Sequence, residues 1–322
     1  MDFDLATLLA PPVLFFVLGF AAALARSDLT VPDAIGKALS LYLMLSIGLK
    51  GGMSLAQGSG EGLMASLAAG VALSFAMPFL AFAILRGPLG LDRPTAAAVA
   101  GHYGSVSVVT FAAASTFVVQ QGLSPEPYMP AVLALMEVPA IVSALWLARR
   151  GADAAASSTT TTELLREVAL SGSIVVLIGS FAIGSILPPP AVKDLSPFVK
   201  DIFPGVLCIF LLDMGLIAGR QIAQAHQLKG GLIGFGLVMP LLGAACGLAA
   251  GLVCGLGPGG VALFAVLGAS ASYIAVPAVM RIALPEANPA VYMTLSLGIT
   301  FPLNVIAGIP LYTALARWVT SG

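Results

Sequence analysis

The sequence predicts an all-α integral membrane protein with ten transmembrane helices, arranged as two inverted five-helix repeats in which spans 4 and 9 are broken and cross each other. Three observations predict this fold: the composition, the number of long apolar runs and the similarity of the two halves. Of 322 residues, 59% are hydrophobic and 9% are charged, whereas a soluble domain carries roughly 25% charged residues. The composition therefore excludes a soluble protein, and the net charge of −1 gives no support to nucleic-acid binding.

A helix needs about 20 apolar residues to cross the hydrocarbon core of a bilayer. Ten runs of the chain meet this requirement, and short groups of Pro, Gly and charged residues separate them. In chain order, the predicted spans are 8–24, 33–49, 62–85, 94–119, 128–147, 164–187, 197–218, 230–256, 259–283 and 289–318.

One polar linker interrupts this series. It reads RRGADAAASSTTTTE at 149–163 and is rich in Ser and Thr. It divides the chain into a first five-helix repeat at 1–148 and a second, inverted repeat at 164–322.

The orientation follows from the Lys and Arg residues, which concentrate in cytoplasmic loops. With the N-terminus outside, the cytoplasmic side holds Arg26, Lys37, Arg86, Arg93, Arg149, Arg150, Arg166, Arg220, Lys229 and Arg281. The external side then holds Lys50, Lys193, Lys200 and Arg317. This asymmetry predicts a multi-pass membrane protein with both termini on the external side, and the membrane is expected to be the bacterial inner membrane.

Three segments of the first half resemble segments of the second half, in the same order and at similar offsets. The pairs are LMLSIGLKGG (43–52) with FLLDMGLIAG (210–219), GSVSVVTFAAAS (104–115) with ASASYIAVPAVM (269–280), and LMEVPAIVSAL (135–145) with GITFPLNVIAGI (298–309). Because each repeat has five spans, the second must enter the membrane upside down. Inverted repeats are typical of secondary transporters, whose sites lie at the repeat interface near the midplane; a duplicated channel or scaffold is the alternative.

The fourth span of each repeat is interrupted at its middle by small polar residues. Unwound backbone is tolerated at this depth only where protein or a water-filled cavity satisfies it, and each half-helix that begins at a break presents a positive end that favours an anion. Close packing of helices through small residues is the alternative interpretation. The predicted anion-binding residues are Gly104, Ser105, Val106, Ser107, Ser270, Ala271, Ser272 and Tyr273.

Two acids, Glu137 and Asp213, lie well inside apolar runs. Such residues are costly in a membrane and are candidates for function by default, although Asp213 is equally well explained by a structural hydrogen bond. His102 precedes the first break and is interpreted as a packing residue. The predicted cation-binding or coupling residues are Thr110, Glu137, Thr300 and Asn304, of which Thr300 mirrors Glu137 in the second repeat.

Other functional classes lack support. Cys208, Cys246 and Cys254 lie in apolar runs without Cys-x-x-Cys spacing, which indicates neither disulfides nor a zinc site. The hydrolase and metalloprotease motifs Gly-x-Ser-x-Gly and His-Glu-x-x-His are absent. No span carries the sustained polar stripe that a channel needs. The protein is therefore predicted not to be an enzyme and to need no cofactor.

Four segments resemble the sodium-dependent bicarbonate transporter (SbtA-type) family over essentially the whole chain: GSVSVVTFAAA (104–114), MEVPAIVSA (136–144), DMGLIAGRQI (213–222) and ASASYIAVPAVMRIALPEANPAVY (269–292). The resemblance implies a gate of spans 1, 2, 6 and 7 and a moving core of spans 3–5 and 8–10. It also implies a homotrimer that holds bicarbonate between the crossed breaks with sodium as coupling ion. A PII-like protein inhibits some members from the cytoplasmic side.

The chain departs from the family pattern at Tyr273, where the family has an acidic residue. A carboxylate is a strong ligand for a hard cation and a phenol a weak one. Three functions are therefore kept in view: sodium-coupled bicarbonate uptake, transport of another small carboxylate or coupling to protons through Glu137, and a non-transporting membrane receptor for a PII-like regulator.

Overall fold

The structure, a computed structural model, describes residues 11–57, 60–150, 166, 170, 172–222 and 228–321. These residues form helices and connecting segments, and no strand occurs among them. The predicted linker lies outside the described residues except for Arg149 and Arg150, and so does the start of the first predicted span.

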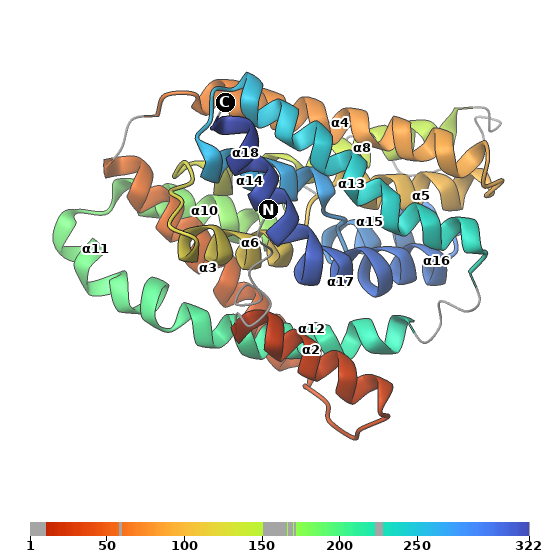
Figure 1. The fold of residues 1–322 in the computed structure, drawn as a ribbon, viewed down its shortest axis with the longest axis horizontal. Helices are drawn as coiled ribbons and strands as arrows, with labels where there is room; N and C mark the ends of the chain where they lie inside the picture. The colour runs from red at the N-terminus through yellow and green to blue at the C-terminus, as the bar shows by residue number, and fades with distance from the viewer. Residues whose placement is uncertain are drawn as a thin grey trace.

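The described part of the first half forms seven helices, and most of them are labelled in Figure 1. The helices of predicted spans 4 and 5 are each divided in two. The bounds are α2 Pro11–Leu24, α3 Asp33–Gln57, α4 Leu63–Arg86, α5 Arg93–Gly104, α6 Val108–Gln120, α7 Met129–Leu135 and α8 Glu137–Arg149.

The described residues of the second half form more irregular helices. Its last helical stretch includes two π-helical segments, η3 and η4. The bounds are α10 Gly172–Ile186, α11 Pro189–Ser196, η1 Pro197–Asp201, α12 Phe203–Ile222, α13 Gly230–Val253, α14 Pro258–Ala269, α15 Ala275–Ala283, α16 Pro289–Met293, η3 Thr294–Thr300, α17 Phe301–Leu303, η4 Asn304–Gly308 and α18 Ile309–Thr320.

Seven helical stretches of the described chain are long and apolar enough to cross a membrane. Three shorter apolar helices, Pro11–Leu24, Val175–Ile186 and Pro258–Ala269, lie within the remaining predicted spans. The all-α membrane fold is thus confirmed, and the count of ten spans stays a prediction.

The second helix is longer than predicted. The sequence analysis placed the end of the second span at Leu49, before Lys50, Gly51 and Gly52. The helix continues to Gln57, and the two glycines serve close packing. A Cβ on Gly52 would lie 2.0 Å from the carbonyl oxygen of Phe181.

Two pairs of helices pack through glycines along one side of the molecule (Figure 1). In the first pair, Gly19 of α2 faces Leu212 of α12 and Ala23 faces Gly219, so α2 and α12 run in the same direction.

The second pair is built in the same way from α3 and α10. Gly48 faces Ser180 and Gly52 faces Ser185, so these two helices also run in the same direction. Each pair joins a helix of the first half to one of the second.

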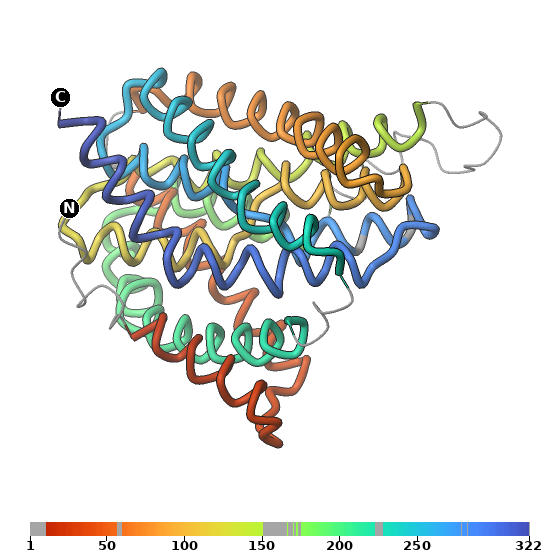
Figure 2. The backbone as a smooth tube through the Cα atoms, turned by 45° about the vertical axis from the view of Figure 1, so that its right-hand side comes forward, coloured from red at the N-terminus to blue at the C-terminus, as the bar shows by residue number. Residues whose placement is uncertain are grey.

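Several of the remaining helices pack within their own half, α4 with α5 and α8, and α14 with α13 and α18. Others join the halves, since α6 packs mainly on α14 and α15 on α8. In both views α4 lies on the opposite side of the molecule from α2 (Figures 1 and 2). Large apolar side chains are exposed on the outer faces of α4 and α13, among them Met64, Phe75, Val238 and Leu241. Such faces suit contact with lipid.

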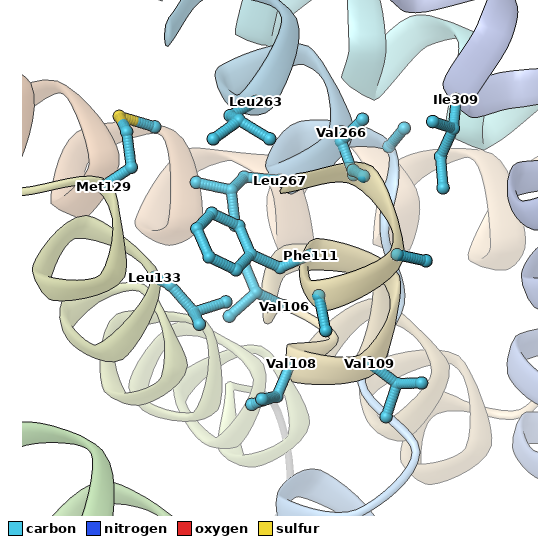
Figure 3. Close-up of a cluster of buried hydrophobic side chains, with 14 of the residues drawn as sticks. Val106, Val108, Val109, Phe111, Met129, Leu133, Leu263, Val266, Leu267 and Ile309 are labelled. Atoms are coloured by element: carbon cyan, nitrogen blue, oxygen red, sulfur yellow. The ribbon is translucent and has the colours of Figure 1, made fainter. Parts of the chain in front are cut away.

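The largest apolar cluster surrounds the beginning of α6 (Figure 3). Phe111 of α6 is 1% exposed and packs with Leu133 of α7 and Leu267 of α14. Side chains from both halves therefore fix the helix that follows the first break.

We expect Gly243→Ala to destabilise the protein. A Cβ on Gly243 of α13 would lie 1.9 Å from the carbonyl oxygen of Gly268 in α14, and backbone cannot move aside as a flexible side chain can. Overpacking of this kind costs about 1–3 kcal/mol. The measurement is the thermal unfolding midpoint in detergent. Gly234→Ala is the matched control, because nothing lies within 4 Å of a Cβ at Gly234 in the same helix. Equal midpoints for both variants would contradict the packing argument.

Candidate functional site

Both predicted breaks are present in the structure. α5 ends at Gly104 and α6 begins at Val108, with Ser105 and Ser107 in extended conformation. Gly104, the last residue of α5, packs closely against α4, where a Cβ would lie 2.3 Å from Pro78 Cγ. The second break separates α14 from α15 and begins at the extended Ser270.

The two breaks satisfy each other's backbone. The amide of Ser107 donates to Ser270 Oγ at 3.1 Å, and the amide of Ser272 donates to the carbonyl of His102 at 2.9 Å. Asn304 Nδ2 donates to the carbonyl of Ala269 at 2.8 Å, at the end of α14. Part of the unwound backbone is thereby paired within the protein, which lowers the cost of burying it.

A small pocket lies at this meeting point. It has room for about one water molecule. Its wall includes the first residue of α6, Val108, and the first residue of α15, Ala275, so two helix N-termini reach it. The lining residues are Met44, Val106, Ser107, Val108, Glu137, Ser272, Tyr273, Ile274 and Ala275.

The hydroxyl groups of the pocket have donor capacity to spare. Ser107 Oγ accepts hydrogen bonds from the amide and the hydroxyl of Thr110, at 3.2 and 2.9 Å, and its own proton remains available. Ser272 Oγ accepts a long hydrogen bond from the amide of Val276 at 3.5 Å. These hydroxyl protons and the two positive helix ends can hold an anion.

Two further polar atoms of the pocket have no partner within the described chain. They are Glu137 Oε2 and the hydroxyl oxygen of Tyr273, and both are buried. The ring of Tyr273 packs edge-on against Phe301, with 5.2 Å between ring centroids. An unpartnered buried polar group is costly, and here two such groups line one cavity.

The structure brings together only part of each predicted residue set. Val106, Ser107, Ser272 and Tyr273 line the pocket, together with Glu137, which the sequence assigned to the cation. The other predicted anion-binding residues are buried in or beside the breaks but do not line it: Gly104, Ser105, Ser270 and Ala271.

The remaining predicted cation residues do not line the pocket, and their polar atoms form hydrogen bonds within the protein. Thr110 is bonded to Ser107. Thr300 Oγ1 lies 2.8 Å from the carbonyl of Gly236, to which it donates, and 2.6 Å from the hydroxyl of Tyr103. Asn304 Oδ1 accepts from Tyr312 at 3.0 Å while its amide nitrogen serves Ala269. These three residues therefore lie outside the lining of the pocket, and their role in cation binding stays a prediction.

Sequence reasoning missed the apolar wall of the pocket. Met44 of α3 and Ile274 of the second break resemble the many other apolar residues of the spans, and only the position of Met44 in a repeated segment marked it. Sequence also missed the backbone role of His102. Its ring is buried, stacks on Tyr292 at 4.6 Å between centroids and lies 2.7 Å from the Ala98 carbonyl through Nδ1, as expected of a packing residue.

Asp213 lies apart from the pocket. It is 7% exposed on α12 and approaches Gly36 of α3, where a Cβ would lie 2.8 Å from Asp213 Oδ2. Among the described residues, no group of three or more His, Cys, Asp or Glu side chains could hold a metal ion.

Comparison with known proteins agrees with this architecture. A family model for the Na+-dependent bicarbonate transporter superfamily matches residues 11–317. A comparison with curated proteins finds no match. Membership of a transporter family indicates that the protein is not an enzyme. The chain is a multi-pass membrane protein that belongs to the Na+-dependent bicarbonate transporter superfamily.

Proposed function

We propose that the protein is a secondary active transporter that takes up a small anion, bicarbonate first, with a sodium gradient as the driving force. The observation that carries this proposal is the pocket between the two breaks, where the N-termini of α6 and α15 meet the hydroxyls of Ser107 and Ser272. Positive helix ends at broken helices are the arrangement by which many transporters hold anionic groups at the midplane.

The proposal includes ten spans in two inverted repeats. The helix pairs support it, because exchanging the repeats converts the α2–α12 pair into the α10–α3 pair. Two side-chain hydrogen bonds are related by the same exchange, since one joins the third and fifth spans and the other joins the eighth and tenth. The hydroxyl of Ser74 in α4 donates to the carbonyl of Met136, and Thr300 in the last span donates to Gly236 in α13.

Spans 1, 2, 6 and 7 are proposed to act as a gate against a moving core of spans 3–5 and 8–10. The position of Met44 supports this division, because this residue of the second span closes a pocket that otherwise belongs to the core. The pocket has room for about one water molecule, so a larger anion requires the core and gate to separate. Such movement would expose the pocket to each side in turn.

The remaining proposals concern surroundings and partners. The distribution of Lys and Arg supports the bacterial inner membrane with both termini external. A homotrimer and a cytoplasmic PII-like regulator rest on the family resemblance. Exposed apolar faces such as that of α13 are suited to lipid and to neighbouring subunits alike.

Two alternatives share this architecture. Transport of another small carboxylate, or coupling to protons, is favoured by Glu137, the one carboxylate lining the pocket. A receptor for a PII-like regulator would not need the pocket to bind anything.

The test is uptake of radiolabelled bicarbonate into proteoliposomes with and without an inward sodium gradient. We expect uptake above that of protein-free liposomes, because the pocket offers an anion site. Formate replaces bicarbonate in a parallel series to examine another small carboxylate. Absence of uptake for both anions under sodium and proton gradients would contradict transport and favour the receptor.

A further inference from the structure

Glu137 is a buried acid in the pocket that contains the anion-binding hydroxyls. It is 3% exposed, its Oε2 has no hydrogen-bond partner within the described chain, and it shares the lining with Ser107 and Ser272. It is the first residue of α8, directly after the interruption at Met136. The carboxyl group therefore faces the space that an anion must enter.

No positively charged side chain lines the pocket to balance a negative charge at this position. The other titratable group of the lining is Tyr273, whose hydroxyl carries no positive charge in either protonation state. The lining contains no Lys, Arg or His.

Charged or titratable groups also lie on the helices that pack against α8 and on α3, which contributes Met44. These groups either form hydrogen bonds elsewhere or lie outside the pocket lining. Arg86 donates to the Leu91 carbonyl, Arg93 to the carbonyls of Leu147 and Arg150, and His102 and Tyr103 have the partners given above. The others on these helices, outside the lining, are Asp33, Lys37, Tyr42, Lys50 and Arg281.

We propose that Glu137 is the coupling group: an anion occupies the pocket only when a cation, either a proton or a sodium ion, neutralises this carboxyl group. The inference rests on the proposed function. Two like charges in a small, water-poor cavity repel strongly because little solvent screens them. Ionised Glu137 and a bound anion therefore exclude each other, and each anion that enters brings one cation with it.

This arrangement accounts for the unpartnered Oε2. A permanent Arg or Lys partner would cancel the charge of the carboxylate. Anion binding would then not depend on a cation from solution. A carboxyl group that lacks a partner depends on an ion from solution, and reciprocal linkage makes the affinity for the anion depend on that ion.

The experiment measures the affinity of the purified protein in detergent for bicarbonate, by titrating free bicarbonate at each pH and each sodium concentration. The pH is varied without sodium, and sodium is then varied at fixed pH. With one cation bound per anion, we expect the affinity to change by about tenfold per pH unit or per tenfold change in sodium, in the range where the cation is not saturating. The arm that responds identifies the cation.

Glu137→Gln separates coupling from binding. The amide is close in shape to a neutralised carboxyl group, so the variant should bind bicarbonate with no dependence on pH or sodium. Asp213→Asn is the matched control: it makes the same change at a buried acid outside the pocket and should keep the native dependence.

Two results would overturn the inference. One is a Glu137→Gln variant that retains the native cation dependence. The other is a Glu137→Gln variant that has the same thermal unfolding midpoint as the native protein but binds no bicarbonate. Failure of the native protein to bind bicarbonate under every condition would instead refute the proposed function, so the two failures are distinguishable.

Discussion

Replacing Ser107 or Ser272 with alanine is expected to weaken bicarbonate binding by about tenfold or more. Both hydroxyls line the pocket beside a helix N-terminus, and the proton of Ser107 is not needed by Thr110. A hydrogen bond to a charged group contributes about 1.5–3 kcal/mol, and about 1.4 kcal/mol corresponds to a factor of ten. Isothermal titration of each purified variant with bicarbonate measures the effect.

The expected effect is on binding and not on folding. Ser143→Ala is the matched control, because Ser143 is also fully buried and its hydroxyl lies 3.1 Å from each of the carbonyls of Pro139 and Ala140, outside the pocket. This control should bind bicarbonate like the native protein. Native affinity in both Ser107→Ala and Ser272→Ala would show that the anion binds elsewhere.

The positions of the two breaks could be predicted from the sequence because their causes are local. Gly and Ser are weak helix formers, and their appearance at the middle of two otherwise apolar runs has few explanations. The full length of α3 could not be predicted in this way. Gly52 lies inside the helix because it meets the backbone of Phe181, a contact that no local pattern records.

The membership of the pocket could be predicted only in part, for the same reason. Hydroxyls such as that of Ser107 stand out in an apolar run, whereas Met44 does not. Thr300 and Asn304 stand out equally, but their polar atoms are satisfied by Gly236, Ala269 and other neighbours. A polar residue in a membrane span needs a partner, and the sequence does not say whether that partner is the protein or a solute.

The hydrogen bonds already formed by these polar residues affect how well the protein can bind a coupling ion. Hard cations are held by several oxygen ligands, and carboxylates are the strongest of these. In the pocket, Tyr273 stands where related transporters are expected to have an acid, and Glu137 is the one carboxylate. Thr110, Thr300 and Asn304 are engaged in hydrogen bonds, so binding sodium through them would first require those bonds to break.

We therefore expect the native protein to bind its driving sodium ion with low affinity, so that bicarbonate uptake responds weakly at low sodium, and Tyr273→Asp to strengthen that response. The new carboxylate would lie in the same pocket as Glu137, and two acids there need an additional positive charge before an anion can enter. The measurement is uptake into proteoliposomes across a sodium titration.

Tyr273→Asn is the matched control: it leaves the same space beside Phe301 without adding charge, and we expect no gain in sodium dependence. A tight, saturable response to sodium in the native protein would show that its sodium ligands lie elsewhere. No response in either Tyr273→Asp or the native protein, with uptake retained, would assign the coupling to protons at Glu137.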